Sequence, residues 1–271
     1  MSYDLRDKVV LITGASGGIG RACAVEFHRA GSLVVAAARS LDKLEALAEE
    51  LGGDRVAAVR LDVTDAVERI KAIAEARSRF GRIDVLVNNA GWASFGSVLK
   101  MPLEHLEHML SLNFVAPVAM IQAVLPEMIE RRSGQIINIS SVVGTQAIPR
   151  MTVYSATKAA LNALSTGLRM ELRGTGVDVL SVAPSSTNTA FFESAATVDA
   201  RATRIAETQY TPERVARAVV RSSRRCRAEA TLSAEGKTIT MIRRISHRAA
   251  DAIMYRVAKK AMPNVDWVHP Q

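Results

Sequence analysis

The sequence has few cysteines and no long apolar run. Cys23 and Cys226 are its two cysteines, too few for the disulfide framework of a small secreted domain, and they suit a reducing compartment. The longest apolar stretch, residues 115–125, contains a proline and a glutamine and is too short to span a bilayer. Residues 1–8 are polar and charged and show no secretory signal pattern. We therefore expect a cytoplasmic protein.

Aromatic residues are also scarce, at 4% of the chain, whereas hydrophobic residues make up 48% of its 271 positions. That content predicts one large globular domain with a substantial core. The net charge of +8 is uneven, because residues 201–260 hold 15 Lys/Arg against 5 Asp/Glu. Such a basic segment can attract nucleic acid or an anionic membrane. No nucleic-acid-binding motif accompanies it, so a solvated helix face is preferred and no nucleic-acid partner is expected.

Strand and helix patterns alternate over the first 220 residues, which predicts a doubly wound parallel sheet in an α/β fold. The first unit is an apolar strand at 8–13, a glycine turn and a helix over 21–30. Small residues let the backbone approach a pyrophosphate, and the helix N-terminus supplies amide donors and a positive dipole end. The spacing Gly-x-x-x-Gly-x-Gly differs from the commoner Gly-x-Gly-x-x-Gly. The candidate cofactor residues here are Gly14, Ser16, Gly18, Ile19 and Gly20.

The second strand, 32–38, ends at the position where a dinucleotide fold meets the adenosine ribose. An acidic residue there binds the 2′-hydroxyl and repels a 2′-phosphate, whereas an arginine does the opposite. Here Ala38 is followed by Arg39, whose guanidinium can pair with a phosphate and stack on adenine. We therefore expect NADP(H) to be preferred, with NAD(H) possible. The alternative is a solvated arginine at a helix start.

The next two strands also end in candidate cofactor residues. After residues 56–61 come Asp62 and Val63; Asp62 is placed either to accept from the adenine amino group or to cap the next helix, for which Thr64 is an equal candidate. After residues 83–87 come Asn88, Asn89, Ala90 and Gly91. Paired asparagines there either form a turn or hold the cofactor cleft in shape.

Tyr154 and Lys158 carry the strongest catalytic expectation. They lie four residues apart in a helix expected over 152–173, which puts both on one face. A phenol normally ionises near pH ~10, and a fixed ammonium beside it favours the phenolate. Ser141 follows the strand 135–139 and lies thirteen residues before Tyr154, so its hydroxyl is placed to donate to a substrate carbonyl. Alone, the Tyr-x-x-x-Lys spacing also fits an ordinary exposed helix face.

Asn113 lies in a long helical stretch over 111–132, where Pro117 is expected to bend the helix or interrupt its hydrogen bonds. A polar residue beside such a break either contacts a site or water, or is satisfied in the core. His105 and His108 are three residues apart, but no third ligand accompanies them, so two surface histidines are preferred and no metal is expected.

The C-terminal third changes character after a strand at 177–182. Pro184, Thr187 and Thr189 follow this strand, and residues 190–210 lack a firm pattern and could form a mobile lid. From 247 onward apolar residues recur in pairs every four positions, typical of one helix face. Packing on the body or on a second subunit is favoured over shallow membrane association, because the stripe is rich in alanine. We expect a nucleotide-binding and catalytic domain over 1–235 and a basic helical extension over 236–271.

The ordered set resembles the short-chain dehydrogenase/reductase family in its single-domain form. The matching residues are Thr13-Gly14-x-x-x-Gly18-Ile19-Gly20, Asp62, Asn88-Asn89-Ala90-Gly91, Asn113, Ser141 and Tyr154-x-x-x-Lys158. The resemblance covers roughly residues 8–190 and implies a Rossmann-like, three-layer α/β/α fold and an NAD(P)-dependent oxidoreductase for an alcohol/carbonyl pair. It implies that Tyr154 is the general acid/base and Ser141 the substrate-orienting hydroxyl. Lys158 would bind the ribose and tune the phenol, and Asn113 would hold a water in the proton relay.

The chain departs from the family pattern at two places. Ser185 stands where a glycine often follows the proline, although Thr189 is in place to reach the carboxamide, and the C-terminal part lacks the glycine-rich ending used in many tetramers. We expect a homo-oligomer, a dimer or a tetramer, without assuming the tetramer.

Apolar residues near the expected mouth predict a hydrophobic ketone, aldehyde or secondary alcohol as substrate; simple packing under the lid is the alternative. They are Trp92, Phe95, Val142, Val143, Ile148, Met151, Phe191 and Phe192. Two other functions stay open: a non-catalytic dinucleotide-sensing protein, and a lipid carbonyl reductase that contacts a membrane through the basic tail.

Overall fold

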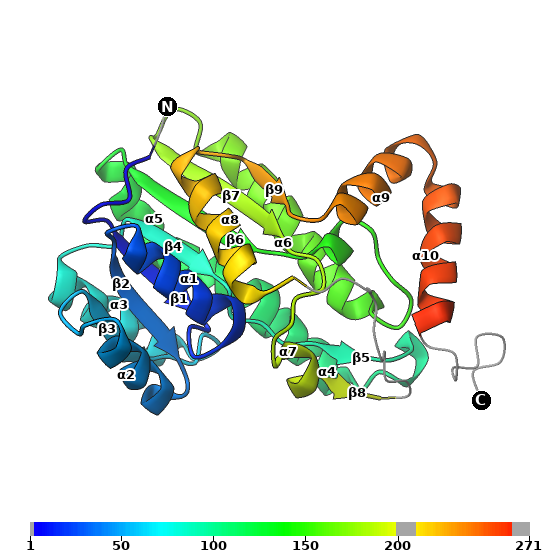
Figure 1. Ribbon diagram of the computed structural model, residues 1–271, viewed down its shortest axis with the longest axis horizontal. Coiled ribbons are helices and arrows are strands. Elements are labelled where there is room, and N and C mark those ends of the chain that lie inside the picture. The colour runs from blue at the N-terminus through cyan, green and yellow to red at the C-terminus, as the bar shows by residue number, and fades with distance from the viewer. Residues whose placement is uncertain (1–2, 199–209, 262–271) are drawn as a thin grey trace.

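A single parallel sheet organises the chain (Figure 1). The computed structural model describes residues 3–198 and 210–261. Within them seven strands pair in the order β3-β2-β1-β4-β6-β7-β9, and every pairing is parallel. The strands are β1 (Val9–Thr13), β2 (Leu33–Ala38), β3 (Val56–Arg60), β4 (Val85–Asn88), β6 (Gly134–Ile139), β7 (Val177–Ala183) and β9 (Glu229–Thr231). The expected doubly wound sheet is confirmed.

Helices cover both faces of the sheet and make three layers. Val10 and Ile12 of β1 belong to one apolar core, and Val9 and Leu11 to the other, because successive side chains of a strand point to opposite faces. The first core is closed by α1 (Gly18–Arg29), α2 (Leu41–Glu50) and α8 (Pro212–Arg224). The second is closed by α3 (Ala66–Phe80), α5 (Ala116–Glu130) and α6 (Thr152–Glu171).

The helical run that carries Asn113 is interrupted by an irregular turn. α4 (Leu103–Leu110) runs through a π turn, η2 (Ser111–Val115), into α5. The turn ends two residues before Pro117, so the irregularity expected near Asn113 is present as a wide turn. By length and composition this run could cross a membrane. In the structure its Met109 and Met120 are fully buried in two of the apolar cores.

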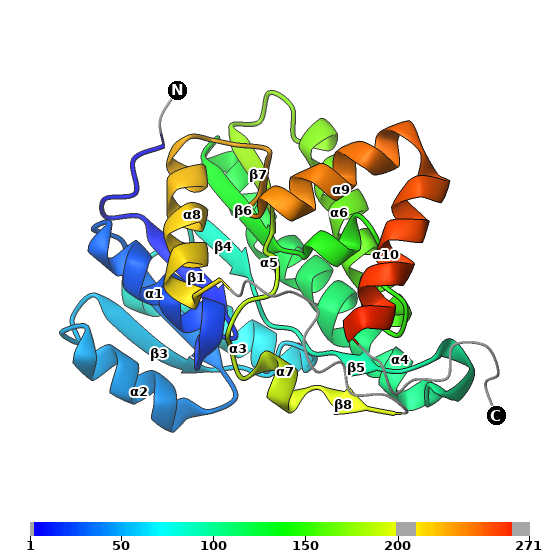
Figure 2. The ribbon, with the colours of Figure 1, turned by 45° about the vertical axis from the view of Figure 1, so that its right-hand side comes forward.

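Smaller elements gather at the carboxyl end of the sheet. They are β5 (Ser94–Phe95), η1 (Val98–Lys100), η3 (Val142–Gly144), α7 (Phe191–Ser194), β8 (Ala196–Thr197), α9 (Ala234–Ile245) and α10 (His247–Ala261). α9 and α10 form the expected helical extension, which stands beside the main body in both ribbon views (Figures 1 and 2). The expected lid is described only to residue 198, so its part over 199–209 lies outside the described residues, as do 262–271.

The strand order reverses between β1 and β4. From β1 the chain moves outward to β2 and β3, and from β4 it moves the other way to β6 and β7. In open parallel sheets, ligands bind outside the carboxyl ends of the strands at such a switch point. The segments that follow β1, β4, β6 and β7 therefore determine the site.

Candidate active site

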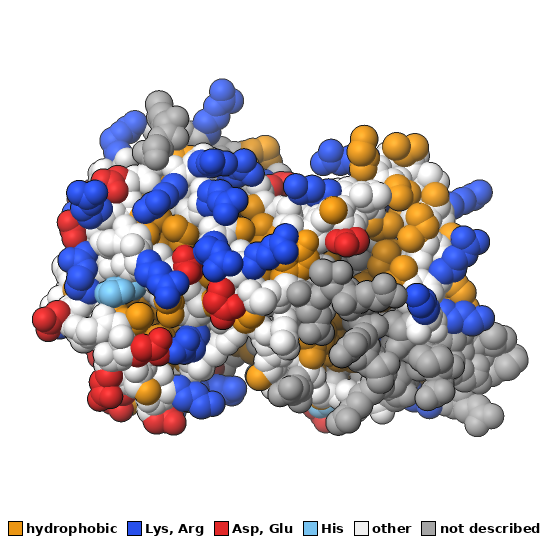
Figure 3. All heavy atoms as spheres, viewed as in Figure 1, with side chains coloured by type: hydrophobic (Ala, Val, Ile, Leu, Met, Phe, Trp, Pro, Cys, Tyr) orange, Lys and Arg blue, Asp and Glu red, His pale blue; other side chains and the backbone are white. Residues whose placement is uncertain are grey.

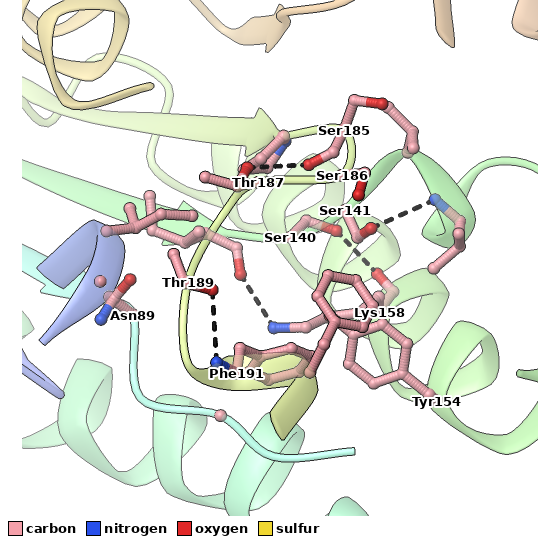
Figure 4. A pocket seen from close by; sticks show the side chains of 18 of the residues that line it. Asn89, Ser140, Ser141, Tyr154, Lys158, Ser185, Ser186, Thr187, Thr189 and Phe191 are labelled. Atoms are coloured by element: carbon pink, nitrogen blue, oxygen red, sulfur yellow. Dashed lines mark hydrogen bonds between the residues drawn. The ribbon is translucent and has the colours of Figure 1, made fainter. Parts of the chain in front are cut away.

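One cleft of about 1210 Å³ lies at this edge and receives residues from almost every strand end. It exceeds the roughly 300–1,000 Å³ of ordinary small-molecule pockets, so it has room for a dinucleotide and a second ligand. Most of the residues expected to bind cofactor line it: Gly14, Ser16, Gly18, Ile19, Arg39, Asp62, Val63, Asn89, Ala90, Gly91, Pro184, Thr187 and Thr189. Ser141, Tyr154 and Lys158 line it as well (Figure 4).

The glycine turn between β1 and α1 is shaped for an anion. α1 begins at Gly18 without a side-chain cap on its first turn, which leaves amide donors and the positive dipole end facing the cleft. Gly14 and Gly18 have φ of 67° and 52°, which other residues rarely adopt. A Cβ on Gly20 would come within 2.2 Å of the Gly14 carbonyl oxygen. Gly20 does not line the cleft; its role is close packing of the turn on the helix.

Asn89 holds this turn in place. Its side-chain Nδ2 donates to the carbonyl oxygen of Thr13 at 2.9 Å and to that of Gly14 at 3.2 Å. The Thr13 hydroxyl oxygen in turn accepts from the backbone amides of Asn89 and Ala90, both at 3.0 Å. Of the two roles considered for these residues, this network corresponds to shaping the cleft. The backbone and glycine geometry together fit the diphosphate of a nicotinamide dinucleotide.

The adenosine end is marked by Arg39 and Asp62. Arg39 is exposed at the cleft, where β2 ends. Asp62 accepts from the Thr64 amide at 2.9 Å and from its hydroxyl at 2.6 Å. Burial acts to raise the pKa of Asp62, but these hydrogen bonds and the charge of Arg39 outweigh it and lower the pKa.

Neither candidate cap of the following helix occupies that position. The N-cap of α3 is Asp65, whose carboxylate accepts from the Glu68 amide at 2.9 Å. The strand is followed by a turn closed by Asp62 and Thr64, so the N-cap lies one residue after Thr64 and three residues after Asp62.

Tyr154 and Lys158 lie on the buried side of α6 and face the cleft (Figure 4). Burial raises the pKa of the Tyr154 phenol above its usual range, and the hydroxyl of Ser141 opposes this in part. The Lys158 ammonium lies 5.9 Å from the centre of the phenol ring and donates to the Ile139 carbonyl oxygen at 2.9 Å. Burial lowers the pKa of Lys158 to about 8. Within the protein alone, desolvation therefore outweighs the expected lowering of the phenol pKa by Lys158.

Ser141 lies two residues after β6 and is the N-cap of η3, where its hydroxyl oxygen accepts from the Val143 amide at 3.3 Å. The Val142 amide donates to the Pro184 carbonyl oxygen at 3.0 Å, which joins this turn to the segment after β7. A Cβ on Gly144 would lie 2.8 Å from the backbone carbon of Lys158. The glycine thus brings the Ser141 turn directly against the helix that carries Tyr154 and Lys158.

Asn113 is fully buried behind the cleft and does not line it. Its Oδ1 accepts from the Trp92 amide at 3.0 Å. Its Nδ2 donates to the Trp92 carbonyl oxygen at 2.9 Å and to the Thr157 hydroxyl at 3.1 Å. The side chain is therefore already engaged in fixing the segment after Gly91 to α6.

Six of the eight residues expected at the substrate side line the cleft: Val142, Val143, Ile148, Met151, Phe191 and Phe192. Trp92 and Phe95 do not. The Trp92 indole donates to the Ser194 carbonyl oxygen at 3.0 Å and packs against two histidine rings. Phe95 is buried beneath the rings of Tyr154 and Phe192. Both therefore support the wall from behind.

Sequence reasoning missed a second apolar wall, supplied by the extension: Ile239, Ile242, Ile253, Met254 and Val257. The paired apolar residues of α10 indicated a buried helix face in the sequence, but they did not indicate which surface this face would cover. His105 and His108, the two histidines considered as metal ligands, belong to no group of three metal-binding side chains in the described part of the chain. The His105 ring is 2.9 Å from the Ser94 hydroxyl, and no group of three metal-binding side chains occurs among residues 3–198 and 210–261.

Comparisons with known proteins agree with this geometry. Residues 8–199 match the family model for short chain dehydrogenases, and α9 and α10 lie beyond the match. An uncharacterized oxidoreductase of Staphylococcus aureus is 38% identical over 186 residues, which is 69% of this chain and 80% of that protein.

Solved structures extend the likeness to nearly the whole chain. A short-chain dehydrogenase from Streptomyces avermitilis superposes with a TM-score of 0.82 at 32% identity, covering 93% of this chain and 97% of that one. A serine dehydrogenase solved with NADP⁺ has a TM-score of 0.74 and 32% identity, covering 83% and 94%. Other structures of this fold hold NAD or NADH. The chain belongs to the short-chain dehydrogenase family and is an NAD(P)-dependent oxidoreductase.

Proposed function

We propose that the protein transfers a hydride between a nicotinamide cofactor, with NADP(H) preferred, and a carbonyl or secondary alcohol on a hydrophobic molecule. The observation that carries this proposal is the convergence of Ser141, Tyr154 and Lys158 on one end of the cleft, directly beside apolar walls. The uncapped start of α1 supports dinucleotide binding in the rest of the cleft.

A bound reduced nicotinamide would supply the hydride, and the protein would supply the proton and the orientation. Ser141 and Tyr154 would both donate to the carbonyl oxygen, which stabilises the charge that develops there. The raised pKa of Tyr154 keeps its proton in place at neutral pH, which suits a general acid in the direction of reduction. In the opposite direction, the charged Lys158 and an oxidised nicotinamide would favour the phenolate.

Asn113 would take part in the proton relay through its backbone. Its side-chain oxygen and both side-chain hydrogens are engaged with Trp92 and Thr157. A relay water would therefore rest on the main-chain carbonyl, which the π turn at Ser111–Val115 turns out of the regular α pattern.

The cofactor preference rests on Arg39. Its position at the end of β2, after the small buried Ala38, leaves no carboxylate to repel a 2′-phosphate. The NADP⁺ bound by the serine dehydrogenase supports the same assignment, whereas the NAD-bound structures of this fold leave room for NAD(H).

Assembly and location remain expectations that accompany the proposal. Exposed apolar side chains at Leu103, Leu110 and Val115, with Met170 on α6, support a homo-oligomeric contact. We expect light scattering to give a dimer or a tetramer, and a single-chain mass would contradict this. A cytoplasmic location and the absence of a nucleic-acid partner also remain predictions.

The decisive experiment is a screen of ketones, aldehydes and secondary alcohols with NADPH and NADH in parallel, followed by Tyr154→Phe. Loss of a general acid typically costs 10²–10⁴-fold in rate, and we expect such a loss in kcat with unchanged NADPH affinity. Undiminished turnover by the phenylalanine variant would refute the assignment. Tight NADPH binding without any turnover would favour the sensing function instead.

A further inference from the structure

The hairpin formed by α9 and α10 lines the outer part of the cleft that holds Tyr154. Ile239 and Ile242 of α9 and Met254 and Val257 of α10 contribute to this lining. Figures 1 and 2 both show the two helices standing beside the carboxyl edge of the sheet. The extension is therefore a wall of the site, although it lies outside the part of the chain that the family model matches.

The two faces of the hairpin differ in chemistry. Ala250 and Ala258 are fully buried, and Met254 between them packs against the apolar cluster that contains Tyr154. Residues 236–261 also hold seven Lys/Arg and one Asp, and Arg244 and Arg256 are among those exposed. Figure 3 shows apolar side chains over this part of the molecule with basic ones around them. Most of the side chains that the hairpin turns toward the cleft are therefore apolar, and its charged side chains are mostly exposed.

Three contacts attach the hairpin to the turn that follows Ser141. A Cβ on Gly236 would lie 2.7 Å from a methyl carbon of Val142, so α9 starts in close contact with η3. Arg243 donates to the Thr145 carbonyl oxygen, and the Gln146 side chain donates to Asp251 at 3.2 Å. Because Ser141 is the N-cap of η3, these contacts fix the apolar wall relative to Ser141.

The opposite side of this part of the cleft is apolar too. Phe191 and Phe192 of α7 line it, together with Val143 and Met151. The α7 segment is held by the parallel pairing of β5 with β8 and by the Trp92 hydrogen bond to Ser194. The described polar residues that the hairpin adds to the lining are Glu235, Thr238 and Lys260, and all three are exposed. The hairpin therefore contributes polar groups to the lining only at exposed positions.

We infer that α9 and α10 select the substrate: a carbonyl compound with its carbonyl near one end of an extended apolar body, any polar group lying at the exposed rim. The inference rests on the proposed carbonyl reduction. It assigns specificity to Ile239, Ile242 and Val257, which lie outside the catalytic set. Affinity should grow with apolar length, since each buried methylene contributes about fourfold.

The test is a series of methyl ketones from butanone to 2-decanone, reduced with NADPH. For the unmodified protein we expect kcat/KM to rise by up to about fourfold per methylene until the wall is covered. Ile242→Asn should lower kcat/KM for 2-decanone at least tenfold and leave butanone nearly unchanged. The matched control is Ile245→Asn on the same helix, because Ile245 is 81% exposed and does not line the cleft. It should keep the original slope.

The outcomes separate this inference from the reaction itself. If kcat/KM does not change with chain length, or if its slope is equal for the two variants, the role of the hairpin in specificity is refuted. The proposed reaction is not affected by that result. If no carbonyl compound is reduced, the proposed reaction is refuted. Calorimetric binding of 2-decanone then tests whether the apolar wall binds an extended apolar molecule. Binding that is at least tenfold weaker for Ile242→Asn than for Ile245→Asn supports the apolar site. Equal binding, or none to the unmodified protein, overturns it.

Discussion

The two halves of the cleft are built by different interactions. The cofactor half consists of turns that follow strands of the same sheet, held by hydrogen bonds between backbone and side-chain groups such as those from Asn89 and Ala90 to Thr13. The outer half consists of helices that belong to no strand–helix repeat, held by apolar packing and by contacts such as Arg243 to Thr145. The first half is suited to a constant charged ligand, and the second to apolar molecules of varied shape.

The difference also explains how each half tolerates change. Hydrogen bonds to backbone atoms require one geometry, and removal of a buried partner costs about 1–3 kcal/mol. An apolar wall tolerates swaps of similar volume and responds to polarity and size. Substitutions in the cofactor half should therefore affect all substrates alike, whereas those in the outer half should sort substrates by shape.

The largest effect is expected at Lys158. Lys158→Met removes the charge that the Ile139 carbonyl oxygen holds beside Tyr154, so the phenol loses its electrostatic support. We expect kcat to fall by about 10²-fold or more for every ketone, within the range for losses of acid–base machinery. Steady-state kinetics with a short and a long ketone measure this. A loss confined to long ketones would contradict the separation of the two halves.

The next effect is expected at Arg39. A hydrogen bond to a charged group contributes about 1.5–3 kcal/mol, so Arg39→Ala should weaken NADPH binding by about 10–100-fold. NADH binding serves as the internal control and should change little, because NADH lacks the 2′-phosphate. Fluorescence titration with both cofactors measures the ratio. Equal losses for the two cofactors would show that Arg39 contacts the adenosine without reading the phosphate.

A smaller effect is expected from pH. Burial lowers the pKa of Lys158 to about 8, so the ammonium is charged below that pH and is lost as pH rises through it. Ketone reduction should accordingly fall by about tenfold between pH 7 and pH 9, since a titrating group loses a factor of ten per unit above its pKa. A pH–rate profile at saturating NADPH measures this, and activity that rises over this interval would contradict it.

The smallest effect is expected where the two halves meet. Gly236→Ala places a methyl group 2.7 Å from a methyl carbon of Val142, and overpacking of this kind costs about 1–3 kcal/mol. The added methyl group should displace Val142 and with it the neighbouring Ser141. We therefore expect a several-fold lower kcat/KM together with a lower melting temperature. Gly167→Ala is the control, because a Cβ there meets nothing within 4 Å. Identical behaviour of the two variants would show that α9 does not position η3.

Local rules account for what was predicted correctly about the fold. The strand–turn–helix order around Gly14 and Gly18 can be predicted from consecutive residues. Parallel strands that alternate with helices then leave few possible topologies. The gathering of Ser141, Tyr154 and Lys158 follows from this topology, because Ser141 follows the carboxyl end of β6 and the other two lie in the first turns of α6, which starts at the same edge of the sheet.

Local rules failed where two distant segments compete for one position. Trp92 was expected in the substrate wall, but it does not line the cleft, and its indole is engaged by the Ser194 carbonyl oxygen instead. The phenol pKa was expected to fall beside Lys158, but burial of the phenol raises it. Desolvation depends on everything that surrounds a side chain, so spacing along one helix could not give its size.

The sequence by itself determined the sheet, the glycine turn after β1 and the pairing of Tyr154 with Lys158 on one helix face, because each depends on residues a few positions apart and on the periodicity of strands and helices. The tertiary structure alone decided what the apolar stripe of α10 covers. The spacing of Ala250, Met254 and Ala258 indicates that one helix face is buried. It does not indicate which surface that face packs against. The contacts of Gly236, Arg243 and Asp251 with the segment after Ser141 place that face against the cleft.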